Sequence, residues 1–172
     1  MIKVTTSLLL IFIVAIGCSS SVSVFEDKIK TRVAENNGEM SSLEIKAAAI
    51  YLDSWSKKDF YQAAIDKFKE EDKGILPVKD LILFTGSSSI RFWSTLKEDM
   101  APHNVLNRGF GGAHISHVNY HFNEIVKPYK PKAIVFFCGT NDLSAFKTPE
   151  ETFEDFSKFF SMVKNDLPGT NL

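Results

Sequence analysis

The sequence predicts an α/β fold in which a parallel sheet is covered by helices on both faces. Three short apolar runs, at residues 81–85, 104–107 and 133–138, have the length and composition of buried strands. A short loop follows each run, and a helix-like stretch follows each loop. Because strand, loop and helix recur three times, we expect parallel strands joined by right-handed crossovers.

Two helices are expected before the first strand. Ser41 and Glu44 have the spacing of a capping box, and the alanine-rich sequence after them favours a helix over 42–56. A similar start signal precedes a second helix over 57–71, whose apolar side chains form one stripe before Gly74.

The rest of the chain divides into three strand, loop and helix units. In chain order these units are 81–85, 86–89 and 90–100; then 104–107, 108–112 and 115–126; then 133–138, 139–142 and 149–166. In parallel sheets of this kind, ligand-binding groups gather at the carboxyl ends of the strands. The three loops are therefore expected at one edge of the sheet.

Length and composition indicate one main globular domain, which we assign to residues 41–172. The chain of 172 residues has a net charge of −1 and is 44% hydrophobic, as is typical of globular proteins. Its 20 basic and 21 acidic residues are interspersed, so no large positive field is available to attract phosphates. We expect no nucleic-acid partner.

The N-terminus resembles an export signal with a lipidation site. Lys3 is the positive start, residues 8–16 form an apolar run too short to span a bilayer, and Cys18 follows a small residue. The stretch 15–18 resembles a bacterial lipobox, in which the cysteine is lipidated after cleavage. We expect a lipoprotein signal peptide over 1–18, with a plain signal peptide or an uncleaved anchor as alternatives.

Residues 19–40 are expected to form a polar tether of moderate flexibility, because they begin with serines and contain the turn signal Asn-Asn-Gly. A lipidated Cys18 would then hold the exported domain on a membrane of the bacterial cell envelope. Cys138 is the other cysteine of the sequence, and we expect it to be a free, buried thiol.

Ser88 is the candidate nucleophile. It follows the first strand and lies at the start of a helix, where backbone N–H groups and the helix dipole favour developing negative charge. The alternative is a helix N-cap, which is the more common role of a serine at such a position.

The other two loops offer hydrogen-bond donors. Gly109, Gly111 and Gly112 allow the second loop to bring its backbone close to a substrate, and Asn141 carries a side-chain amide. These groups could stabilise an oxyanion, or they could be turn residues only. Nucleotide binding is disfavoured, because the glycines lack both the Gly-x-Gly-x-x-Gly spacing and the P-loop pattern.

The three loops with their strands resemble the first three sequence blocks of the SGNH hydrolases, the GDSL-like serine esterases. The matching segments are LFTGSSSI at 83–90, NRGFGG at 107–112 and GTND at 139–142. The resemblance extends from about residue 58 to 172 and implies a flavodoxin-like, three-layer α/β/α sandwich. It also implies that Ser88 attacks an ester carbonyl without a metal or organic cofactor. The oxyanion would be held by the Ser88 N–H, the Gly112 N–H and the Asn141 side chain.

The sequence departs from the family pattern at two points. Ser87 stands where many members have Asp, although the Ile90, Arg91 and Trp93 that follow resemble one branch of the family. The family's Asp-x-x-His block, which supplies the general base, has no counterpart in the sequence. We therefore expect a domain that is incomplete at its C-terminus. The helix over 149–166 would then expose part of its apolar side: Phe156, Phe159, Phe160 and Met162.

Three histidines lie along the helix over 115–126 and just before it. The spacing of His114, His117 and His121 could hold a metal, but we expect surface residues and no metal site. His114 follows Gly112 closely and could border the pocket.

Two functions therefore remain open. The first is a lipid-anchored serine esterase acting on a small-molecule, lipid or carbohydrate ester outside the cytoplasm. The alternative is a catalytically inactive or truncated SGNH-like binding module. A flavodoxin-like cofactor binder is disfavoured, because the serine-rich first loop has no aromatic clamp for a flavin.

Overall fold

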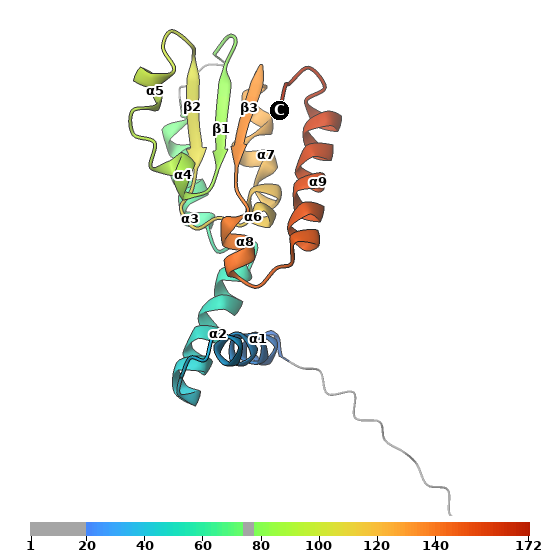
Figure 1. The fold of residues 1–172 in the computed structure, drawn as a ribbon. Coiled ribbons are helices and arrows are strands. Elements are labelled where there is room, and N and C mark those ends of the chain that lie inside the picture. Colours follow the sequence, from blue (N-terminus) through green and yellow to red (C-terminus); the bar gives the residue numbers. More distant parts are fainter. Residues whose placement is uncertain (1–19, 74–77) are drawn as a thin grey trace, which may run out of the picture.

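The computed structural model describes residues 20–73 and 78–172 (Figure 1). The expected signal peptide over 1–18, including Cys18, lies outside the described residues. The helices and strands are α1 (Ser21–Glu35), α2 (Ser42–Ser56), α3 (Gln62–Glu71), β1 (Ile82–Gly86), α4 (Ser88–Arg91), α5 (Leu96–Asp99), β2 (Val105–Gly109), α6 (Ile115–Tyr120), α7 (Phe122–Ile125), η1 (Lys127–Tyr129), β3 (Ala133–Phe137), α8 (Thr140–Ser144) and α9 (Pro149–Asp166). None of the helices in the described ranges is long and apolar enough to span a membrane.

The described strands form a parallel sheet in the order β2-β1-β3, with β1 in the centre (Figure 1). Gly86 at the end of β1 lies opposite Gly109 of β2 and Phe137 of β3, so the carboxyl ends of the three strands are level. The chain runs from β1 to β2 on one side, then returns past β1 to β3. This reversal makes a topological switch point, the place where open α/β sheets bind ligands.

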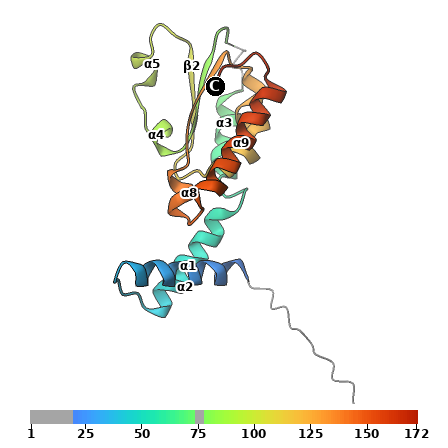
Figure 2. The same cartoon turned by 45° about the vertical axis from the view of Figure 1, so that its right-hand side comes forward.

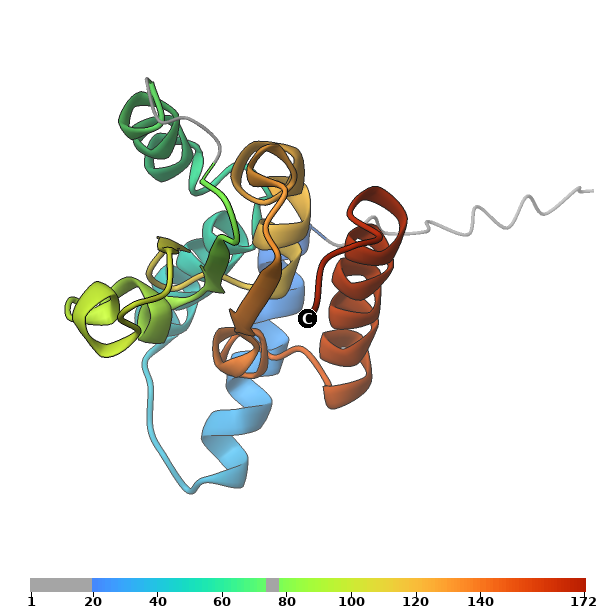
Figure 3. The same ribbon diagram turned by 90° about the horizontal axis from the view of Figure 1, so that it is seen from above.

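Helices cover both faces of the sheet, which confirms the expected three-layer architecture (Figure 3). One face packs on α3, α6, α7 and α9, and the opposite face packs on α4 and α5. Side chains alternate along a strand, so Leu83 enters the larger core while Phe84 packs with Ile90 and Leu96 on the other face.

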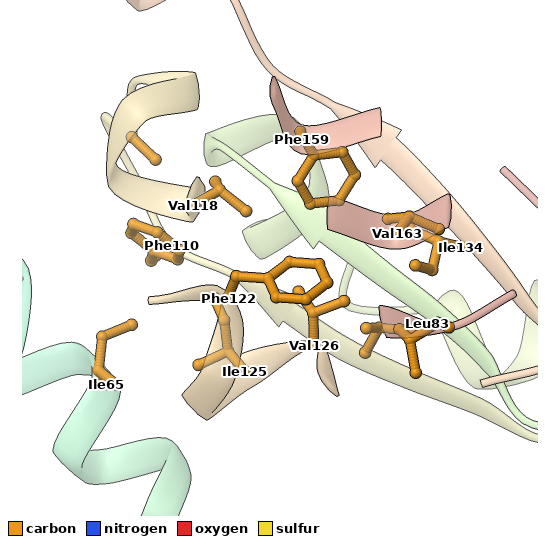
Figure 4. Packing of buried hydrophobic residues seen from close by; sticks show 12 residues of the cluster. Ile65, Leu83, Phe110, Val118, Phe122, Ile125, Val126, Ile134, Phe159 and Val163 are labelled. Carbon is orange, nitrogen blue, oxygen red and sulfur yellow. The ribbon is translucent and has the colours of Figure 1, made fainter. Parts of the chain in front are cut away.

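The larger core lies between the sheet and the helices α6, α7 and α9 (Figure 4). Phe122 and Phe159 are both fully buried and meet edge to face, with 5.9 Å between ring centroids. The other buried members are Ile65, Leu83, Phe110, Ala113, Val118, Ile125, Val126, Ile134, Val163 and Leu167. The expectation that Phe159 would be partly exposed is wrong, because α9 packs it against β3 and α7. Its neighbour Phe160 is 42% exposed.

The outer side of β3 is less covered. Asn171 forms a single parallel bridge with Ala133 at the start of the strand. Further along the strand, on the face shared with Phe84, Val135 is 38% and Phe137 is 53% exposed. Apolar side chains therefore reach solvent at this edge of the described structure.

Helices α1 and α2 form a hairpin beyond the carboxyl edge of the sheet (Figures 1 and 2). The segment 19–40, expected as a flexible tether, is instead helical over Ser21–Glu35. The reason is an apolar stripe at helical spacing, which packs against α2 and which the polar flanks concealed. The members of this stripe are Val22, Phe25, Ile29 and Val33.

Several predicted helices are shorter or divided. The second helix begins at Gln62 rather than at 57, and the stretch 115–126 is divided into α6 and α7. The stretch 90–100 is divided into α4 and α5, because the Asp99 carboxylate accepts hydrogen bonds from the Trp93 indole and the Thr95 hydroxyl, both at 2.6 Å. These local bonds stabilise a turn in place of a continuous helix.

Candidate active site

The three loops that follow the strands lie together and are joined by hydrogen bonds. The Ser87 N–H donates to the Phe137 carbonyl at 3.0 Å, which joins the ends of β1 and β3. The Phe110 N–H donates to the Gly86 carbonyl at 3.1 Å, which joins β2 to β1. The second and third loops are joined by the Asn141 side chain, described below. The structure therefore brings the predicted site segments to one edge of the sheet.

Ser88 is placed by a sharp turn at the end of β1. Gly86 has a φ of +134°, and a Cβ on it would lie 2.0 Å from the Phe137 carbonyl oxygen, so the turn requires glycine. Ser88 is then the first residue of α4. It is half-buried, whereas Ser87 is buried and Ser89 is exposed. Of the three serines, Ser88 alone is partly buried and still accessible at the start of α4.

Backbone donors without a partner are present at this edge of the described structure, and those of Ser88 and Gly112 are among them. Among the described residues, the N–H groups of Ser88 and Gly112 donate no hydrogen bond to the protein. Both residues are half-buried. A free, partly desolvated N–H group is the type of donor that stabilises an oxyanion.

Gly112 occupies a position that only glycine fits. Its φ is +79°, and a Cβ would lie 2.5 Å from the Tyr61 hydroxyl oxygen. The Trp55 indole N–H is shared between that hydroxyl and the Gly112 carbonyl, at 2.9 Å from each oxygen. Sequence reasoning did not find Trp55 and Tyr61 near the site, because nothing in an amphipathic N-terminal helix indicates which loop it contacts.

Asn141 lies in the first turn of α8, after Gly139 with its φ of +124°. Its side-chain amide donates to the Ala113 carbonyl at 3.0 Å, so one amide proton joins the third loop to the second. The other proton of the same amide is available for a second acceptor. Asn141 is half-buried, as Ser88 and Gly112 are.

An ionic network fixes the segment that carries Asn141. The fully buried Asp142 carboxylate accepts from the Ile115 N–H at 3.1 Å and from Lys147 Nζ at 2.8 Å. Lys147 also donates to Asp155 of α9 at 2.5 Å. Burial alone would lower the pKa of Lys147, but the two carboxylates outweigh it and raise the pKa, so the ammonium stays charged.

The histidines of α6 are buried, which corrects the expectation that they lie on the surface. His114, His117 and His121 are at most 1% exposed. His117 lies in α6 and packs on Tyr61, while His114 and His121 flank the two ends of the helix. The His114 ring packs on Trp55 and His117, and His117 Nε2 bonds the Lys57 carbonyl at 3.1 Å. Burial lowers the pKa of His114 to about 3 and that of His117 to about 4.

No hydrogen bond among the described residues joins Ser88 to one of these histidines, and the Nε2 atoms of His114 and His121 are buried without a partner. His117 Nδ1 accepts from the His114 N–H at 2.9 Å, and His121 Nδ1 bonds Glu124 at 2.8 Å. Within residues 20–73 and 78–172, no group of three or more His, Cys, Asp or Glu side chains could hold a metal ion.

Cys138 is a free, half-buried thiol. Burial raises its pKa to about 12, and its Sγ–H donates to the Ala113 carbonyl at 3.2 Å. A protonated thiol is a poor nucleophile. The residue therefore fills space beside the loops as a free thiol, although it is half-buried rather than buried as expected.

Comparison with known proteins bears on the fold. No protein-family model and no curated protein matches the chain. A Streptococcus pneumoniae protein, provisionally described as a platelet activating factor, is similar at a TM-score of 0.59 and 21% identity, over 72% of this chain and 57% of that one. A GDSL-like lipase from Bacteroides thetaiotaomicron is similar at a TM-score of 0.53 and 21% identity, over 60% of this chain and 54% of that one. A Bacteroides fragilis protein, provisionally described as an acylhydrolase, is similar at a TM-score of 0.53 and 20% identity, over 59% of this chain and 52% of that one.

The chain thus spans little more than half the length of these structures, from 52% to 57%. At such identities the similarity concerns the fold, and it confirms the architecture that the resemblance to SGNH hydrolases implies. The chain has the fold of the GDSL-like lipases and acylhydrolases.

Proposed function

We propose that the chain is an SGNH-type serine hydrolase that cleaves carboxylic esters through an acyl-Ser88 intermediate. The observation that carries this proposal is that hydrogen bonds join the three loops at the carboxyl edge of the sheet, where the free N–H groups of Ser88 and Gly112 and the amide of Asn141 also lie. The fold shared with GDSL-like lipases and acylhydrolases supports it.

In the proposed reaction, the Ser88 Oγ attacks the ester carbonyl carbon and loses its proton to a general base. The carbonyl oxygen becomes an oxyanion, stabilised by the Ser88 N–H, the Gly112 N–H and the Asn141 side chain. Collapse of this intermediate expels the alcohol, which takes the proton back from the base. Water then releases the acid from Ser88 by the same steps. Each such donor typically contributes about 10² to 10³ in rate.

The alternative, an inactive binding module, depends on whether a general base is available to Ser88. The 172 residues contain no Asp-x-x-His, and the rings of the buried His117 and His121 bond to groups other than Ser88. A serine hydroxyl without a positioned base is a weak nucleophile. These observations favour the second candidate function, a catalytically inactive SGNH-like module that binds an ester or a related ligand at the same edge.

Hydrolysis of a chromogenic short-chain ester distinguishes the two candidates. An esterase gives a burst of released alcohol that Ser88→Ala abolishes, whereas Ser89→Ala keeps it, because the exposed neighbour has no role in the mechanism. Equal rates in the wild type and in Ser88→Ala would reject the esterase. Binding of a non-hydrolysable ester analogue without turnover would establish the inactive module.

We further propose that lipidated Cys18 anchors the protein to a membrane of the bacterial cell envelope, where it meets its substrate. The support is the lipobox-like sequence at 15–18. Metabolic labelling with a fatty-acid analogue should mark the wild type in the membrane fraction. Cys18→Ser should remove the label. A labelled Cys18→Ser, or an unlabelled wild type, contradicts the anchor.

A further inference from the structure

Trp55, near the C-terminal end of α2, contacts the glycine loop from a distant part of the sequence. Its indole N–H lies 2.9 Å from the Gly112 carbonyl oxygen and 2.9 Å from the Tyr61 hydroxyl oxygen. The residue lies before the region that resembles the SGNH blocks, and the mechanism above assigns it no role. The contact therefore links the N-terminal hairpin to the backbone of a proposed oxyanion donor.

Other hydrogen bonds anchor the residues that follow Gly112 in the glycine loop. The Ala113 carbonyl accepts from the Asn141 amide at 3.0 Å, and the Ile115 N–H donates to Asp142 at 3.1 Å. Trp55 holds the peptide between Gly112 and Ala113. The Gly112 N–H beside these anchored groups donates no hydrogen bond to another described residue. Since glycine rotates more freely than other residues, this N–H keeps its direction only if the adjoining peptides are held.

The hairpin also contacts the segment after Asn141. Lys28 Nζ donates to the Phe146 carbonyl at 3.3 Å, and the Arg32 guanidinium lies 4.2 Å from the centre of the Phe146 ring. Ala145 is part of the buried cluster formed by α1 and α2. One hairpin therefore packs against both loops that carry the proposed donors.

We propose that Trp55 is a positioning residue of the active site. Its indole N–H holds the Gly112 carbonyl and thereby restricts the rotation of Gly112, so that the Gly112 N–H, in the preceding peptide, faces the substrate carbonyl oxygen. The inference rests on the proposed esterase function. Trp55 itself does not touch the substrate. Because the oxyanion forms after binding, misplacing its donor lowers kcat and leaves KM nearly unchanged.

Trp55→Phe tests this role, because it keeps an aromatic ring against His114 and removes the N–H. We expect kcat for a chromogenic ester to fall roughly 10-fold, as for the loss of one hydrogen bond, with KM within about twofold. The matched control is Trp93→Phe. The Trp93 indole also makes one side-chain bond, to Asp99 at 2.6 Å, but lies against Phe84 on the other face of the sheet. It should keep the wild-type kcat.

A second replacement separates positioning from packing. Exchanging the indole of Trp55 for benzothiophene keeps the bicyclic shape and removes only the donor, so it applies even if Trp55→Phe unfolds. The proposal requires the same fall in kcat in a protein that remains folded at the assay temperature. A wild-type kcat in the benzothiophene protein overturns it while leaving the esterase intact. If the wild type lacks Ser88-dependent hydrolysis, the esterase fails, and this role fails with it.

Discussion

At the scale of single residues, the turn that presents Ser88 depends on a glycine. A Cβ on Gly86 would overlap the Phe137 carbonyl oxygen, which is only 2.0 Å away, at a φ of +134°. We expect Gly86→Ala to lower the free energy of unfolding by about 3 kcal/mol, because β1 and β3 must separate. Urea denaturation measures this loss. Gly169→Ala is the matched control: nothing lies within 4 Å, so its effect should stay within about 0.5 kcal/mol. Equal free energies of unfolding for the two variants would contradict the conclusion that the turn after β1 requires a glycine at position 86.

The buried histidines predict a dependence of stability on pH. Burial lowers the pKa of His114 to about 3 and of His117 to about 4, from 6.5. The unfolded chain therefore binds protons first, so their contribution is complete above about pH 6.5 and is lost as pH falls towards 4. Each group changes the free energy of unfolding by up to about 1.4 kcal/mol per pH unit.

Urea denaturation between about pH 7.5 and 4.5 measures that slope. His114→Phe should reduce it, because the apolar ring has no proton to bind and keeps the ring contact with Trp55. His103→Gln alters an exposed histidine and should leave the slope as in the wild type. An undiminished slope in His114→Phe would show that other groups govern the acid sensitivity.

At the scale of helices and strands, Lys147 holds three elements together. It joins Asp142 of α8 to Asp155 of α9, while Asp142 caps the first turn of α6. We expect Lys147→Met to destabilise the protein by about 3 kcal/mol, because the buried Asp142 carboxylate loses its counter-ion. Thermal or urea unfolding checks this value. Lys158→Met, at an exposed position of α9, should be nearly neutral. A neutral Lys147→Met would mean that solvent replaces the ammonium.

The same scale shows where prediction from sequence succeeded. The strands were located to within about two residues, because buried parallel strands are short apolar runs bounded by polar loops. The helix at 21–35 was missed, because its stripe of four apolar residues is interrupted by charged ones. The break between α4 and α5 was missed as well, because it depends on bonds to the Asp99 side chain.

At the scale of the whole molecule, apolar surface lies along the outer side of β3 and the adjoining helices. A groove there is lined by Phe137, Leu143, Phe153 and Phe156, and Phe153 is 67% exposed. We expect the 172-residue chain to bind an apolar fluorescent dye and to associate as its concentration rises. Phe153→Ser should weaken both effects without loss of stability. Leu43→Ser is the control, because it removes an equally exposed side chain, 76% accessible, from the distant hairpin. Equal dye binding in both variants would show that the dye binds to an apolar surface other than this groove.

The sequence by itself determined the sheet, its parallel direction, and the three loops that carry Ser88, Gly112 and Asn141, since these follow from local hydrophobic patterns and glycine positions. Tertiary structure alone decided that the histidines of α6 face inward, that Lys147 lies between two carboxylates, and that Trp55 reaches Gly112. The contacts of Trp55 and His117 join residues far apart along the chain, and those of Lys147 join two helices across a turn. No local pattern contains them, because they depend on how the helices dock after the strands have paired.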